Sequence, residues 1–177
     1  LRMTVERRGV VLSSDLEWRE LNMAVRDVVQ AAAGVGGGNE YVEDVFSTYL
    51  YAGNGSTQTI ENGIDLDGEG GLVWIKGRDD GAHPHSLYDT ERGVTKQLST
   101  NYNSPENVTS SSPTQDFVSF NSNGFSLGEP WNTGNLNSTA MTKITSWSFR
   151  KSPKFFDVVT WSGNSVAGRA IPHNLGS

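Results

Sequence analysis

From residue 41 onward, apolar and polar residues alternate in short runs, and turn sequences rich in glycine, asparagine and aspartate separate these runs. Alternation with a period of two is typical of β-strands that bury one face. Many short strands with no helical pattern between them predict a mainly β fold, an antiparallel β-sandwich. The predicted strands cover residues 45–51, 72–76, 86–88, 117–120, 124–127, 144–150 and 156–161.

Residues 1–38 follow a different pattern and predict one α-helix ahead of the strands. Ser14 and Glu17 have the spacing of a capping box, which starts the helix near residue 15, and Gly34 ends it. Apolar residues recur along this helix at steps of three and four, the spacing of a coiled-coil seam. The seam residues are Trp18, Leu21, Val25, Val28 and Ala32.

A glycine-rich hinge at residues 34–38 separates this helix from the strands. A helix of this length is marginal alone, so its seam must pack against something. One alternative is the core of its own β domain, and the other is a copy of itself or a neighbouring protein. Because a flexible hinge fixes a helix poorly onto its own domain, we favour a docking and oligomerisation segment at residues 1–38.

One pattern occurs twice in the chain: a run headed by phenylalanine, a Gly-Asn turn, and a second run that ends in isoleucine. It covers residues 46–60 and again residues 156–171, and the matched phenylalanines and turn glycines lie 110 positions apart. Each copy predicts a β-hairpin. Since an interval of this length suits a whole all-β domain, we expect one module at residues 41–151 and the start of a second, truncated module at 154–177.

Composition narrows the range of partners. A net charge of −6 argues against a nucleic-acid partner, because a surface that binds phosphates needs clustered lysine and arginine. No run approaches the roughly 20 apolar residues of a membrane-spanning helix, so we expect no membrane insertion. The chain has no cysteine, which excludes disulfides and thiolate zinc sites.

Candidate catalytic and metal-binding residues are few. His83 and His85 could face one side of a strand and bind a metal, but no third ligand is evident, which favours a polar loop. Residues 65–69 resemble part of a calcium loop without its last carboxylate, which favours a solvated turn. Asp89 and Arg92 have the spacing of a structural ion pair, and we expect an exposed pair that contributes little energy. Because no nucleophile motif is present, we expect no catalytic activity, no cofactor and no required metal.

The tryptophans divide into two groups. Trp74 and Trp147 lie within strand patterns and are expected in the core. Trp131 lies in a turn-rich loop beside Asn132 and Asn135. A flat apolar ring beside amides is the combination that binds sugars, so these three residues are a candidate glycan-binding site. The alternative is that Trp131 covers the core as a lid.

Six motifs follow one another in a fixed order. They are FSTYLYAGNG at 46–55, GLVWIK at 71–76, LYDTERG at 87–93, FNSNGFSLG at 120–128, SWSFRK at 146–151 and IPHNLG at 171–176. This set resembles a repeat domain of large virion proteins of marine tailed phages, usually described as tail-fibre or phage structural proteins. The resemblance covers about residues 41–177. A looser likeness connects the domain to jelly-roll and concanavalin-like sandwiches of lectin-type modules.

The resemblance implies a viral structural protein, made in the host cytoplasm and located in the virion, in a tail fibre used for host attachment. Residues 1–38 would then bind another virion protein, a tail adaptor or nozzle or the capsid. A homo-oligomer is implied, with three copies per fibre as the usual arrangement. Two alternatives remain: a carbohydrate-binding, lectin-like module for host-surface glycans, and a head decoration or spike protein.

Overall fold

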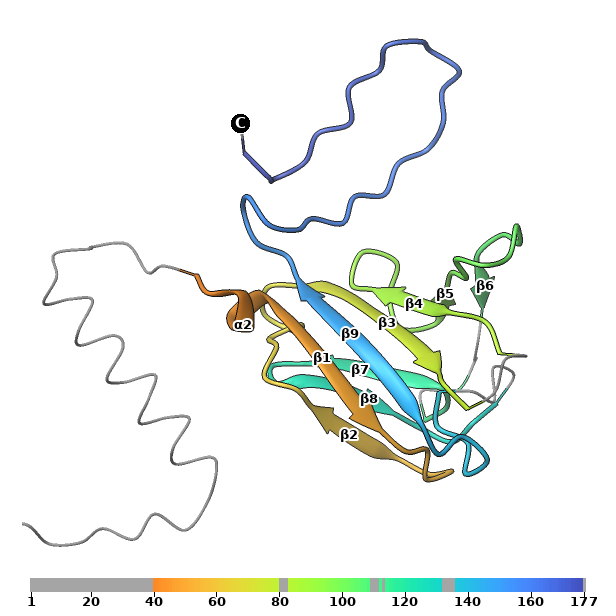
Figure 1. Ribbon diagram of the computed structural model, residues 1–177. Coiled ribbons are helices and arrows are strands. Elements are labelled where there is room, and N and C mark those ends of the chain that lie inside the picture. The colour runs from red at the N-terminus through yellow and green to blue at the C-terminus, as the bar shows by residue number, and fades with distance from the viewer. Residues whose placement is uncertain (1–39, 80–82, 109–111, 113, 132–135, 177) are drawn as a thin grey trace, which may run out of the picture. The chain divides into compact units, whose positions relative to one another are not determined.

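The computed structural model describes residues 40–79, 83–108, 112, 114–131 and 136–176 (Figure 1). Residues 41–177 form one compact unit. The described part is mainly β with very little helix. It contains the short helix α2 (Val42–Val45) and the strands β1 (Phe46–Tyr51), β2 (Gln58–Glu61), β3 (Gly71–Gly77), β4 (Ser86–Asp89), β5 (Lys96–Gln97), β6 (Asn107–Val108), β7 (Phe117–Asn121), β8 (Gly124–Leu127) and β9 (Ile144–Arg150). We call residues 41–151 the β domain and residues 152–176 the C-terminal segment.

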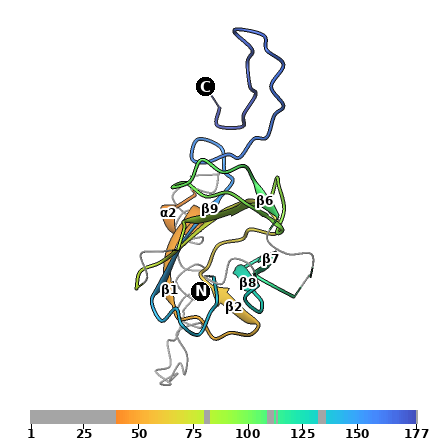
Figure 2. The same ribbon diagram turned by 90° about the vertical axis from the view of Figure 1, so that its right-hand side faces the viewer.

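Two antiparallel sheets form the β domain, one with the order β1-β9-β3-β4 and one with the order β2-β8-β7. They lie face to face as two layers, which is clearest in the view of Figure 2. Strands β5 and β6 form a small separate pair beside β4. β1 is an edge strand of the four-stranded sheet, and β2 is an edge strand of the three-stranded sheet.

The core lies between the two sheets and follows from the alternation of each strand. On β3 the inward positions are Val73 and Ile75, which are at most 1% exposed. Tyr88 of the same sheet stacks on Phe117 of the opposite sheet, with ring centroids 4.6 Å apart. Phe117 in turn stacks on Phe125 at 5.5 Å. Burial of aromatic rings of this size is a major stabilising contribution in a domain of two small sheets.

Six of the seven predicted strands are confirmed, and the strands at residues 124–127 and 144–150 match the prediction at both ends. The predicted strand at residues 156–161 is wrong. Only an isolated bridge between Ser152 and Phe156 occurs there, and residues 157–161 have no strand. The alternating pattern is present, but a strand also requires a neighbouring strand to satisfy its backbone groups.

The predicted hairpin at residues 46–60 is also wrong. β1 pairs with β9 and β2 pairs with β8, so the two strands belong to opposite sheets. The turn after Tyr51 therefore crosses from one layer to the other. Gly53 anchors this crossing, because its backbone N donates a hydrogen bond of 2.8 Å to the Met141 carbonyl oxygen.

The expectation that Trp74 and Trp147 lie in the core is wrong as well. Both are half-buried, and both face away from the opposite sheet. The reason is the period of two: Val73 and Ile75 take the inward positions of β3, so Trp74 between them must point outward.

The helix predicted near residues 15–33, its seam and the hinge at 34–38 lie outside the described residues. Within the described part, none of the helices has the length and hydrophobicity that a membrane span requires.

Candidate functional site

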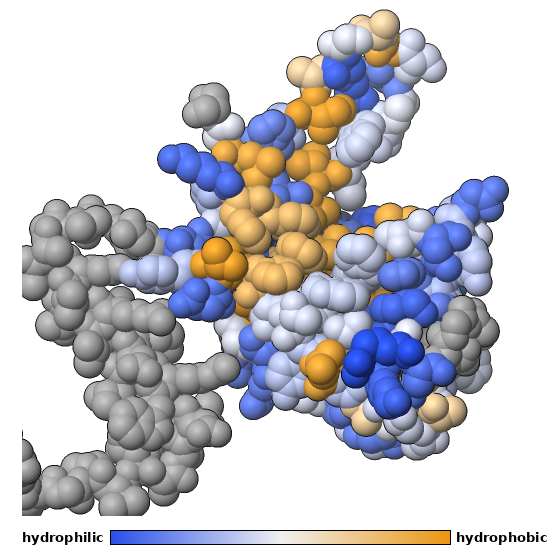
Figure 3. All heavy atoms as spheres, viewed as in Figure 1, coloured by the Kyte–Doolittle hydropathy of each residue, from blue (hydrophilic) through white to orange (hydrophobic). Residues whose placement is uncertain are grey.

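The outer face of the four-stranded sheet carries a row of aromatic side chains, which we call the outer aromatic face. Its members are Phe46, Trp74, Trp147 and Phe149. Register places Phe46 opposite Phe149 and Trp74 opposite Trp147, and the ring centroids of these pairs are 4.9 and 5.3 Å apart. Figure 3 shows hydrophobic residues gathered on this side of the molecule, near the start of β1 and the end of β9. All four rings are half-buried, and a row of partly covered aromatic rings is a feature of surfaces that contact other protein segments.

His85 belongs to this face rather than to a metal site. Its Nδ1 accepts a hydrogen bond of 2.8 Å from Nε1 of Trp74, and the two rings lie 5.4 Å apart. Desolvation, with a smaller contribution from the charge of Lys76, lowers the pKa of His85. The neutral imidazole is thus the form that this contact requires. In the described part of the chain, no group of three or more His, Cys, Asp or Glu side chains could hold a metal ion.

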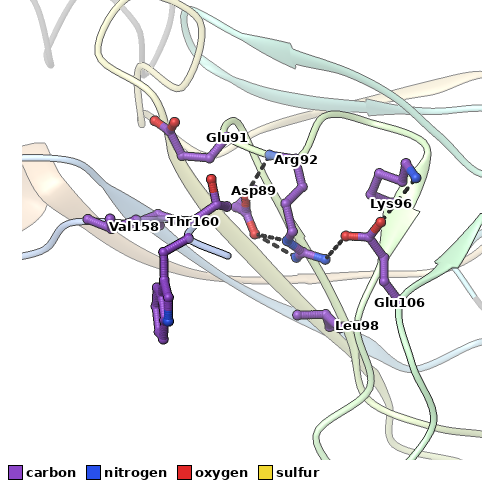
Figure 4. Close-up of a pocket in the computed structure, with 10 residues that line it drawn as sticks. Asp89, Glu91, Arg92, Lys96, Leu98, Glu106, Val158 and Thr160 are labelled. Atoms are coloured by element: carbon purple, nitrogen blue, oxygen red, sulfur yellow. Dashed lines mark hydrogen bonds and ion pairs between the residues drawn. The ribbon is translucent and has the colours of Figure 1, made fainter. Parts of the chain in front are cut away.

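A cavity of about 560 Å³ opens beside the end of β4 (Figure 4). Asp89 and Arg92 form its floor. The Arg92 backbone N donates to Oδ1 of Asp89 at 2.9 Å, and Arg92 Nε donates to Oδ2 at 2.6 Å. The pair is largely buried, with 4% of the Asp89 side chain and 13% of the Arg92 side chain exposed. The predicted pairing is confirmed, but the expectation that the pair is exposed is wrong, because the turn after β4 buries both side chains.

The ion pair extends into a chain of alternating charges. Arg92 also contacts Oε2 of Glu106 at 3.4 Å, and Lys96 Nζ lies 3.0 Å from Oε1 of Glu106. Figure 4 shows the Arg92 guanidinium between the carboxylates of Asp89 and Glu106. The hydrogen bond from Lys96 is the main cause that lowers the pKa of Glu106, with Arg92 contributing. The carboxylate is therefore held ionised, which suits binding or structure better than proton transfer at neutral pH.

The wall of the same cavity comes from the C-terminal segment, through residues 158–161. A second group of contacts fixes this segment to the β domain. Lys151 Nζ lies 2.7 Å from Oε1 of Glu91 and 3.6 Å from Oδ1 of Asp157. The ring of Phe156 lies 5.2 Å from that of Phe149, which also contacts Phe46.

The distal end of the C-terminal segment returns to its start. The backbone N of Asn174 donates to Oδ2 of Asp157 at 2.7 Å, and the backbone N of Lys154 donates to the Leu175 carbonyl oxygen at 3.0 Å. The bond from Asn174 is the main cause that lowers the pKa of Asp157. The segment is thus a closed loop that is tied at its base.

The predicted glycan-binding residues are only partly described. Trp131 is 57% exposed, so it is not a buried lid on the core. Its backbone N donates to Oδ1 of the buried Asp116 at 3.0 Å, which ties the backbone of Trp131 to the β domain. Asn132 and Asn135 lie outside the described residues, as do all five seam residues of the predicted helix.

The acidic stretch at residues 65–69 adopts the predicted turn. Oδ1 of Asp65 accepts a hydrogen bond of 2.9 Å from the backbone N of Gly68, and the turn is mostly exposed. Sequence reasoning missed Lys96 and Glu106, the outer half of the charged chain. No local motif could reveal them, because the loop brings Glu106 back to residues that precede it by 10 to 14 positions.

The profile of a domain family of unknown function (DUF7483) matches residues 42–177. The chain belongs to this family. The DUF7483 match includes both the β domain and the C-terminal segment that borders the charged cavity. No curated protein and no solved structure matches the chain.

Proposed function

We propose that this DUF7483 chain is a structural, non-enzymatic component of a tailed-phage virion, and that it builds part of a tail fibre. Residues 1–38 attach the protein to a tail adaptor or nozzle and to other copies of itself, three per fibre. The β domain is a jelly-roll or concanavalin-like sandwich that extends toward the host surface. The support from sequence is the ordered set of motifs over residues 41–177.

The observation that carries this function is the way in which the β domain continues along the chain. β9 runs directly into a second copy of the opening sequence of the domain itself, at residues 156–171. The rings of Phe149 and Phe156 and the ion pair of Lys151 with Asp157 fix this junction. A domain that ends by starting its own sequence again is the arrangement expected of a serial, fibre-like protein.

Removal of the N-terminal segment tests the assignment of the anchor. A phage that encodes the chain without residues 1–38 should assemble particles from which the protein is missing, while the truncated protein stays folded. Immunoblots of purified particles measure incorporation, and circular dichroism of the purified protein measures folding. Incorporation of the truncated protein at the normal copy number would contradict the anchor.

The same domain on the capsid would make the chain a head decoration or spike protein. Immunogold labelling with an antibody against the β domain separates the two locations, because gold would mark heads rather than tails. We place the protein in the tail on the basis of the fibre-type motifs.

Glycan binding is a second candidate function, favoured by the exposed ring of Trp131, whose backbone N is bonded to Asp116. An exposed aromatic ring offers a stacking surface for a sugar. Binding of host-surface oligosaccharides on an array should then fall at least about tenfold in Trp131→Ala, a loss of roughly 1.4 kcal/mol. Trp131→Phe should retain part of the binding, and equal binding by all three proteins would eliminate this site.

A further inference from the structure

We propose that residues 156–171 are a docking unit that takes the positions of β1 and β2 in a second β domain of the same kind. Residues 156–161 would lie beside a β9-type strand, and Trp161 would be buried in the place that Tyr51 occupies here. This docking would explain how successive domains of the proposed fibre are joined. It rests on the proposed function only in requiring that a second domain is present.

The positions of β1 and β2 show what such a unit does. β1 is bonded to β9 alone and β2 to β8 alone, so the first copy of the pattern adds one edge strand to each sheet. It also contributes to the core between the sheets. The hydroxyl of Tyr51 donates to the Leu136 carbonyl oxygen at 2.9 Å, and Ile60 is 3% exposed. An opening segment of this kind therefore adds one edge strand to each of two sheets, whose other strands are hydrogen-bonded to one another without it.

The second copy of the pattern, at residues 156–171, also has apolar residues, but in the described structure it pairs with no sheet. Trp161 occupies the position in the second copy that Tyr51 occupies in the first, yet its side chain is 63% exposed. Val166 is 64% exposed. Alternation places Val159 on the same face of a strand as Trp161, as Tyr49 is placed relative to Tyr51. A segment with this alternation of apolar side chains can become a strand when the edge of a sheet offers it backbone partners.

The turn of the second copy already has the geometry of the first. In the first copy, the backbone N of Ser56 donates to Oδ1 of Asn54 at 2.9 Å. In the second copy, the backbone N of Val166 donates to Oδ1 of Asn164 at 3.1 Å. The same asparagine turn thus forms in both places, so the unit is locally prepared for the crossing between two layers.

Gly53 and Gly163 occupy matching positions in the two copies, and their surroundings indicate what the second copy would bind. A Cβ on Gly53 would lie 2.1 Å from the Ser138 carbonyl oxygen, so close approach to that backbone requires glycine. A Cβ on Gly163 would meet nothing within 4 Å, and its φ lies outside the left-handed region. Neither the space around Gly163 nor its backbone conformation requires a glycine at this position of the C-terminal segment. If residues 156–171 dock onto a second domain, Gly163 would approach the backbone at the position equivalent to Ser138, and only glycine would fit there.

The two glycines also provide a matched test in the existing chain. Gly53→Val should lower the Tm strongly, since the new side chain collides with backbone. Gly163→Val should leave the Tm unchanged, because the site is open. Thermal unfolding followed by circular dichroism measures both. A loss of stability in Gly163→Val comparable to that in Gly53→Val would overturn the assignment of Gly163 to a partner.

The most direct test uses a longer protein in which residues 63–151 are repeated directly after Asn174. We expect the added part to fold and Trp161 to become buried. Fluorine NMR of the fluorotryptophan-labelled protein measures this burial as loss of the solvent-isotope shift at Trp161, assigned with Trp161→Phe. Gly163→Val should now unfold the second domain while the first stays folded.

A control chain has residues 156–174 replaced by residues 46–62, the authentic opening strands. If the added domain folds in the control chain but not behind residues 156–174, the docking unit is refuted. Persistent exposure of Trp161 in a folded second domain, or no effect of Gly163→Val there, refutes it too. None of these variants changes residues 1–38, so loss of the docking unit and loss of the virion anchor are separate results.

Discussion

At the residue scale, the side chain of Asn137 connects three stretches of backbone in the β domain. It is 0% exposed. Its Oδ1 accepts from the backbone N of Asn54 at 3.0 Å and from the Gln58 side chain. Its Nδ2 donates to the carbonyl oxygens of Gly128, at 2.9 Å, and Ser56. All four hydrogen-bonding sites of the amide are therefore used.

Asn137→Ala should destabilise the protein by about 2–3 kcal/mol, because it leaves buried donors and acceptors without partners. The comparison is Asn164→Ala, which removes an amide side chain from an exposed turn of the C-terminal segment and should change the free energy of unfolding by less than about 0.5 kcal/mol. Urea denaturation followed by fluorescence measures both. Equal effects of the two substitutions would contradict this role for Asn137.

His85 gives the outer aromatic face a pH dependence. Its pKa is lowered in the folded protein, so the unfolded chain binds the proton more readily. Stability from this group is then complete above the unfolded pKa of about 6.5 and is lost as the pH falls below that value. The pKa values of Glu106 and Asp157 are also lowered, so their contributions disappear only at more acidic pH.

We therefore expect the Tm to fall between pH 7 and pH 5 and the fall to be smaller in His85→Gln, whose amide can still accept from Trp74. Thermal unfolding at matched ionic strength measures this difference. A fall of the same size in both proteins would show that another group causes it.

At the element scale, alternation predicted the strands well wherever a neighbouring strand exists. It could not assign strands to sheets. Residues 46–60 have the sequence of a hairpin, yet β1 and β2 separate because the backbone at Gly53 is bonded to Met141, far along the chain. Residues 156–161 have the pattern of a strand without a partner. β5 and β6 are too short to show any period.

The turn after β4 depends on the Asp89–Arg92 pair. Arg92→Ala should cost about 3 kcal/mol, since it leaves the carboxylate of Asp89 buried without its guanidinium partner. Arg92→Lys should cost less, because it keeps the charge but not the paired geometry. Lys96→Ala, on a side chain that is 37% exposed, should change the free energy of unfolding by less than about 1 kcal/mol. Urea denaturation ranks the three, and a larger loss in Lys96→Ala than in Arg92→Ala would contradict the buried pair.

At the scale of the whole molecule, the two-layer β architecture follows from composition and period, but the candidate site does not. The charged cavity joins the turn after β4, the loop that carries Glu106 and the C-terminal segment. Only the short-range pair at its floor has a sequence signal. The outer aromatic face was equally hidden, because strand alternation does not say which face is covered; Trp74 and Trp147 could have faced either way.

The central claim is that the chain is a virion component. Quantitative mass spectrometry of gradient-purified particles, from a phage whose genome contains the coding sequence, tests it most directly. We predict peptides from residues 41–151 at a fixed ratio to a known tail protein, unchanged after a high-salt wash. Peptides found only in the lysate of infected cells, and absent from the purified particles, would contradict the claim.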